Sequence, residues 1–170
     1  DGFSYSEQAL AGQGLTAGTA VTCNGVQYNW PAAGAGQPDN VISGGQTIRL
    51  LPVSGATEIG ILGAATNGPS TGQITITYSD GTTQQVALGF SDWTLNANGS
   101  PPSYGNTEVA SMSYRNSVGG QTQTVNTYVF SATIPVTAGK TVTSVTLPSS
   151  TNQGSLHLFA IGSDKGPLTS

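Results

Sequence analysis

Residues 73–78 alternate strictly between apolar and polar side chains. In an extended chain Ile74, Ile76 and Tyr78 share one face, and Thr75 and Thr77 share the other. A period of two predicts a β-strand with one buried face, and it excludes an amphipathic helix over the same residues.

Turn residues punctuate the rest of the chain at similar intervals. The dipeptides Asn24-Gly25 and Asp80-Gly81 are of the kind that turns one strand back on the next. Ten short segments with strand character cover residues 21–23, 26–30, 47–51, 58–62, 73–78, 84–90, 108–114, 124–132, 142–147 and 156–161. Short strands at this spacing predict an all-β fold, an antiparallel β-sandwich or jelly roll, rather than a parallel sheet with crossover helices.

One short helix is expected near the start of the chain. Ser4 and Glu7 have the spacing of a capping box ahead of the apolar residues 9–11. The length of 170 residues suits one domain. We expect a single β-sandwich domain over residues 1–162, followed by a tail or linker over residues 163–170.

The low charge of the chain excludes several classes of partner. Charged residues make up 7% of the sequence, with eight acids, four Lys or Arg and a net charge of −4. Four scattered cations supply neither the basic stripe that nucleic acid requires nor a polybasic membrane anchor. No apolar run approaches the roughly 18 residues that span a bilayer. The Thr, Ser and Gly bias with little Lys is typical of secreted bacterial proteins, so we expect an extracellular location.

Side chains for nucleophilic or metal catalysis are scarce. Cys23 is the only cysteine, and we interpret it as a small buried side chain. His157, the only histidine, lies between Leu156 and Leu158 in a predicted strand, where a structural role and a ligand contact are both open. No Gly-x-Ser-x-Gly motif supplies a nucleophile, and a catalytic zinc needs more His or Cys ligands. We therefore expect no enzymatic activity.

Two long irregular segments, residues 31–45 and 91–107, carry polar and aromatic side chains of the kind that binds sugars. The apolar face of a pyranose packs on an aromatic ring, for which Trp93 is the main candidate. Amide and carboxylate groups are suited to sugar hydroxyls. The predicted ligand-binding residues are Trp93, Asp92, Asp39, Asn40, Tyr114, Arg115, Asn116 and Tyr104.

Other roles remain open for some of these residues. Arg115 also suits a salt bridge with Asp92 or Glu108. Oxygen atoms of Asp39, Asn40, Asp92 and Glu7 permit a structural calcium ion, although no calcium-binding motif is present. Carboxylate pairs for glycosidase chemistry would come from Asp39, Glu58, Asp92 and Glu108.

Eight short motifs follow one another along the chain. They are Phe3-Ser4-Tyr5-Ser6, Tyr28-Asn29-Trp30-Pro31, Gln37-Pro38-Asp39-Asn40, Gly60-Ile61-Leu62-Gly63, Asn67-Gly68-Pro69, Gly89-Phe90-Ser91-Asp92-Trp93, Tyr114-Arg115-Asn116 and Leu156-His157-Leu158-Phe159-Ala160-Ile161. Over residues 3–161 the chain resembles the galactose-binding-like β-sandwich modules of secreted bacterial glycoside hydrolases, such as those attached to α-mannosidase-type enzymes. The resemblance implies a jelly-roll fold, an extracellular setting and a carbohydrate-binding role. It transfers no ligand residues.

Three functions therefore follow from the sequence. The first is a non-catalytic carbohydrate-binding module that binds a neutral glycan through loops at one end of the sandwich and is attached to a catalytic glycoside hydrolase domain in the same parent chain. The alternative is a structural or interaction module that braces a catalytic domain without binding sugar. The third is a small hydrolase that uses a carboxylate pair.

Overall fold

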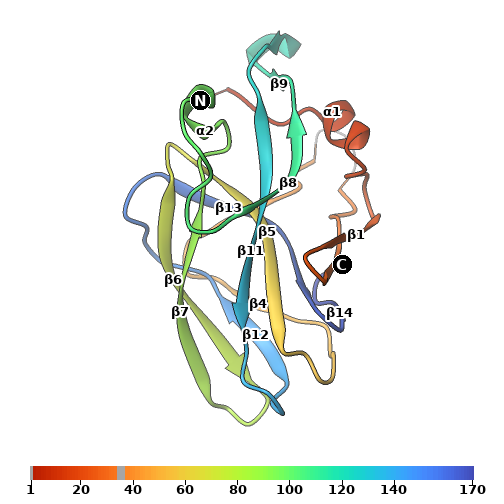
Figure 1. Ribbon diagram of the computed structural model, residues 1–170, viewed down its shortest axis with the longest axis vertical. Helices are drawn as coiled ribbons and strands as arrows, with labels where there is room; N and C mark the ends of the chain where they lie inside the picture. The colour runs from red at the N-terminus through yellow and green to blue at the C-terminus, as the bar shows by residue number, and fades with distance from the viewer. Residues whose placement is uncertain (1, 34–36) are drawn as a thin grey trace.

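Two antiparallel β-sheets packed against each other form the frame of the molecule (Figure 1). The computed structural model describes residues 2–33 and 37–170. The arrangement confirms the predicted all-β sandwich. Both short helices lie at the end of the sandwich that carries the N-terminus, and the turn between β6 (Ser70–Tyr78) and β7 (Thr83–Phe90) lies at the other end (Figure 1).

The larger sheet contains eight strands within the described residues. Their bounds are β1 Ala20–Cys23, β2 Val26–Asn29, β3 Val41–Ile42, β5 Glu58–Thr66, β8 Thr107–Met112, β11 Thr127–Pro135, β13 Ser155–Ser163 and β14 Gly166–Pro167. The order is β1-β2-β13-β5-β11-β8, and β3 and β14 also pair with β13. The predicted turn at Asn24-Gly25 joins β1 to β2, with φ of 51° and 77° at its two residues.

The smaller sheet is simpler, with strands in the order β4-β12-β6-β7. Strand β4 is Thr47–Arg49 and β12 is Val142–Thr146. The predicted hairpin at Asp80-Gly81 joins β6 to β7. A separate two-stranded ladder pairs β9 (Arg115–Asn116) with β10 (Thr122–Gln123), and the 3-10 turn η1 (Val118–Gly120) lies between them.

Apolar cores lie on both faces of the larger sheet. The inner core, between the two sheets, includes Ile61 and Ile76. The outer core lies under the N-terminal segment and includes Leu62, Trp30 and Phe159. Because both faces are covered, β5 is buried along nearly its whole length and shows no alternation. The sequence therefore predicted the end of this strand too early, at residue 62 rather than at Thr66.

The predicted N-terminal helix is α1 (Glu7–Gly12), but it begins two residues later than the capping pattern indicates. Ser6 is the N-cap, and its hydroxyl accepts a hydrogen bond from the Ala9 amide at 3.2 Å. Ser4 instead forms a backbone bridge with Asn116. The second helix, α2 (Leu95–Asn98), is a single turn. No helix among the described residues has the length and apolar character to cross a membrane.

The prediction of a tail or linker after residue 162 is wrong. Ser163 is the last residue of β13, and β14 folds back onto that strand. Leu168 is 2% exposed, and its carbonyl accepts a hydrogen bond from the Leu51 amide at 2.8 Å. A short segment with Gly and Pro resembles a linker in composition, but here it pairs with β13 and contributes Leu168 to the inner core.

Candidate ligand-binding site

The N-terminal segment crosses the outer face of the larger sheet at one end of the sandwich (Figure 1). A cavity of about 630 Å³ opens beside this segment. Its walls come from the N-terminal segment, the loop before β3, Trp93 after β7, and strands β5 and β13. The volume lies within the range of about 300–1,000 Å³ that is typical of small-molecule sites.

Aromatic rings form one side of this cavity. The rings of Tyr5 and Trp93 meet edge to face, with centroids 5.0 Å apart. Trp30 is 3% exposed and stacks on Phe159 at 4.8 Å. Tyr5 donates a hydrogen bond to the Tyr128 carbonyl. Burial raises the pKa of Tyr5, and the nearby carboxylates of Asp39 and Asp92 raise it further. The phenol is therefore neutral, and its ring is fixed in place.

A chain of hydrogen bonds forms another part of the cavity wall. The Asn40 amide nitrogen donates to Asp39 Oδ1 at 2.9 Å, so Asn40 Oδ1 faces His157 Nδ1 at 2.8 Å. His157 Nδ1 must then carry the ring proton, and Nε2 accepts from the Thr66 hydroxyl at 3.1 Å. Burial lowers the pKa of His157, which keeps the imidazole neutral at neutral pH.

The sheet register explains why these side chains meet. His157 pairs with Ala64 in β5, and Thr66 lies two residues further along on the same face. Strand β3 pairs Ile42 with His157 on the other side of β13. Residues 39 and 40 immediately precede β3, so the pairing of β3 with β13 places Asp39 and Asn40 in the cavity wall beside His157. The chain of hydrogen bonds thus ties the loop to the sheet.

Arg115 lies at the rim of the cavity, on its aromatic side. Its guanidinium carbon is 3.8 Å from the centre of the Phe3 ring and 5.0 Å from that of Trp93. Its Nε donates to Gln123 Oε1 at 2.8 Å. Within the described residues the salt bridge found is elsewhere, between Lys140 and Asp80. The alternative of a salt bridge from Arg115 to Asp92 or Glu108 is therefore wrong.

Asp92 does not face the cavity, which corrects its assignment as a ligand residue. It is 7% exposed. Its carboxylate accepts hydrogen bonds from the Gly68 amide, from the Thr94 amide and hydroxyl, and from the Asn96 amide, at 2.6–3.2 Å. These bonds hold the turn α2, in which all four residues have a φ between 51° and 71°. Asp92 thus positions the segment that follows Trp93.

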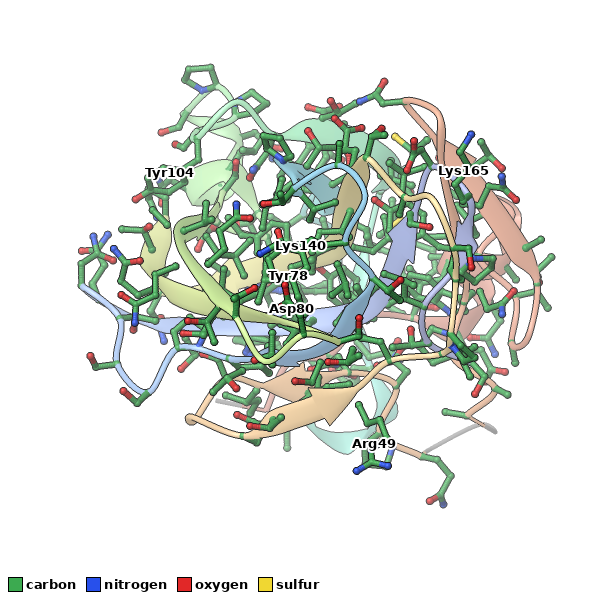
Figure 2. All side chains as sticks on the ribbon, turned by 90° about the horizontal axis from the view of Figure 1, so that it is seen from below. Arg49, Tyr78, Asp80, Tyr104, Lys140 and Lys165 are labelled. Atoms are coloured by element: carbon green, nitrogen blue, oxygen red, sulfur yellow. The ribbon has the colours of Figure 1, made fainter. Side chains whose placement is uncertain are left out.

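Tyr114 and Tyr104 also lie outside the cavity wall. The Tyr114 hydroxyl accepts a hydrogen bond from the Ser6 hydroxyl at 3.2 Å. Tyr104 is 48% exposed and covers Gly89 so closely that a Cβ atom there would lie 2.5 Å from the Tyr104 ring. It borders a second, smaller cavity of about 370 Å³ beside β7. Figure 2 shows Tyr104 near one edge of the molecule, well away from Lys140, Tyr78 and Asp80.

The structure thus brings together part of the predicted site. Trp93, Asp39, Asn40 and Asn116 line the cavity, and Arg115 stacks on its rim. Lining side chains that the sequence analysis did not select include Phe3, Tyr5, Gln8, Gln37 and Thr66. Phe3 and Tyr5, two aromatic residues near the start of the chain, are the sequence feature that could have indicated the N-terminal part of this wall.

The described residues offer no ready-made metal site. No group of three or more His, Cys, Asp or Glu side chains is placed to hold a metal ion in the part of the chain that the structure describes. Calcium also binds backbone and amide oxygens. The predicted calcium site therefore stays a prediction.

The fold and the cavity together define a β-sandwich domain with an open cavity at one end. The model of one family, the AziU2-like beta-sandwich domain, matches residues 2–166. The chain belongs to this family of β-sandwich domains, which agrees with the sandwich fold that the resemblance implied. No curated protein matches the chain.

Proposed function

We propose that this chain is a non-catalytic carbohydrate-binding module whose binding site is the cavity at the N-terminal end of the sandwich. In this proposal the module is secreted and belongs to a longer chain with a catalytic glycoside hydrolase domain. The observation that carries the proposal is the pairing, in one open cavity, of aromatic rings with amide and carboxylate groups.

The lining residues suit both faces of a sugar. Trp93 is half-buried in the cavity wall and offers ring surface for the apolar face of a pyranose. The side chains of Asp39, Gln37 and Asn116 offer carboxylate and amide groups for its hydroxyls. The hydrogen-bonded link from Asn40 through His157 holds residues 39 and 40 in place before any ligand arrives, which reduces the entropic cost of binding.

The expected affinity is modest. A single shallow sugar site of this kind supplies roughly 4–8 kcal/mol, which corresponds to dissociation constants from about millimolar to about micromolar. Tethering to a catalytic domain turns such binding into a higher local concentration of enzyme at the polysaccharide surface. Weak binding is therefore sufficient for this function.

A glycan array on the folded chain, followed by calorimetric titration of each hit, tests the proposal. We expect one class of sugar to bind, and we expect Trp93→Ala to weaken that binding at least about tenfold because it removes the stacking surface. Tyr104→Ala is the matched control, since it removes an exposed aromatic ring outside the cavity. An array without hits, on protein shown to be folded, would overturn the proposal. Repeating the array with EDTA tests the calcium prediction.

One observation favours the alternative function, a module that braces a catalytic domain. Val41 and Ile42 in the short strand β3 are 41% and 56% exposed. Adjacent exposed apolar side chains suit a contact with another domain. A blank glycan array, together with loss of interdomain contact in an Ile42→Asp variant of the parent enzyme, would favour this function.

A further inference from the structure

The described wall of the cavity carries negative charge and no positive side chain. Glu7 and Asp39 supply two carboxylates, and neither Lys nor Arg is among the described lining residues. Neither carboxylate forms a salt bridge within the described part of the chain. Asp39 Oδ1 accepts a hydrogen bond from the side-chain amide of Asn40 at 2.9 Å, and this hydrogen bond holds the carboxylate in position.

The single histidine does not offset this charge. His157 lies in the wall between Asn40 and Thr66, with both ring nitrogens already engaged. Its imidazole is neutral because Nδ1 donates, Nε2 accepts and burial disfavours the charged form. His157 therefore fixes the loop that carries Asp39 but brings no positive charge to the cavity.

The aromatic rings at the rim already hold one cation. Arg115 lies over Phe3 at 3.8 Å and over Trp93 at 5.0 Å. Ring faces attract cations because the π-electron density above them is negative. Burial lowers the pKa of Arg115, and the nearby carboxylate of Asp92 acts in the opposite direction. Glu7 and Asp39 therefore supply two negative charges to the described cavity wall, against one guanidinium at its rim.

We propose that this cavity selects sugars that carry a positive charge, namely hexosamines with a free amine, over neutral and acidic sugars of the same configuration. The inference rests on the proposed function, because it specifies the ligand of the same cavity. It departs from the neutral glycan that the sequence predicted. An ammonium group is attracted by the two carboxylates, whereas a uronic acid meets like charge.

Calorimetric titration with matched monosaccharides tests this selectivity. The probes are the hexosamine, the N-acetylhexosamine, the neutral hexose and the hexuronic acid, each in the gluco, galacto and manno configurations. We expect the amine of one configuration to bind about tenfold tighter than its N-acetylated form, a difference of about 1.4 kcal/mol. The preference should shrink between about 0.01 M and about 1 M salt, because the Debye length falls from about 30 Å to about 3 Å.

Isosteric variants connect the selectivity to the carboxylates. Asp39→Asn and Glu7→Gln should each reduce the preference for the amine over the neutral hexose of the same configuration. Glu108→Gln is the control, because it makes the same change in net charge on an exposed residue outside the cavity wall. Equal binding of amine and neutral sugar, or tighter binding of the uronic acid, would overturn the inference but leave the proposed function intact. Absence of binding by every probe and every array glycan would overturn both.

Discussion

Ala97 has a side chain that fits its backbone poorly. Its φ of 58° and ψ of 40° lie in the left-handed region. There a Cβ atom crowds the following carbonyl oxygen, and only Gly, Asn and Asp enter the region readily. Asn96 and Asn98, on either side, are of the tolerant type. The Ala97 methyl is exposed, so it makes no buried contact that would offset the crowding. Ala97→Gly should therefore stabilise the domain.

The size of the effect follows from two opposing contributions. The left-handed conformation costs roughly 1–2 kcal/mol for a residue with a Cβ atom. Glycine has more freedom in the unfolded chain, which costs about 0.5–1 kcal/mol on folding. The difference leaves Ala97→Gly more stable by about 0.5–1 kcal/mol. For a domain of this length that corresponds to a rise in Tm of about 1–4 °C.

Urea denaturation followed by tryptophan fluorescence measures this difference. Ala11→Gly is the matched control, because Ala11 is an exposed alanine in the helix α1, where the same substitution should destabilise by about 0.5–1 kcal/mol. The two variants should thus shift the midpoint in opposite directions. A loss of stability in Ala97→Gly as large as that in Ala11→Gly would refute the reasoning from backbone conformation.

Three further results are expected. The pKa of His157 is lowered in the folded protein, so near pH 6.5 the unfolded chain takes up a proton that the folded protein does not. The free energy of unfolding should therefore fall as the pH drops below about 6.5. Urea titrations at several pH values should show that His157→Gln removes this part of the pH dependence. Asp92→Ala should destabilise the protein by about 2–4 kcal/mol in chemical denaturation, because it leaves several donors of a buried turn without an acceptor. Hydrogen bonds from the Thr82 side chain and backbone are the main reason why the pKa of Asp80 is lowered to about 2. The stabilising effect of the ionised Asp80 carboxylate is present above about pH 4 and is lost as the pH falls through about 2. In Thr82→Val, a carboxyl NMR titration should show the titration midpoint of Asp80 moving up toward the ordinary value of 3.8.

The sequence predicted the parts of the fold that depend on local pattern. The alternation from Ile74 to Tyr78 and the turn dipeptides at residues 24–25 and 80–81 required no knowledge of distant contacts. The failures depend on packing between distant segments. Strand β5 shows no alternation because both of its faces are buried, and the segment from Ser163 to Leu168 is held by pairing and burial that composition does not reveal.

The candidate site was harder to predict, because its members are far apart in the sequence. His157 meets Asn40 across 117 positions and Thr66 across 91. No spacing rule connects such residues before the strand order is known. Asp92 and Trp93 illustrate the same difficulty at short range. The backbone of Ala65 bonds to both Ser91 and Trp93, and this anchorage decides that the carboxylate points into the turn while the indole lines the cavity.

Strand β13 lies between β2 and β5 in the larger sheet, yet it is made from nearly the last residues of the sequence. During synthesis β2 and β5 remain unpaired with β13, because they leave the ribosome about 130 and about 95 residues earlier. Pairings of such long range also form slowly. Until β13 inserts, the apolar outer face under the N-terminal segment has no complete sheet to pack on. His157, which ties the binding loop to the sheet, arrives with that same strand. The last step of folding and the assembly of the cavity are therefore expected to be one event, so that a chain competent to bind a ligand has also completed its sheet.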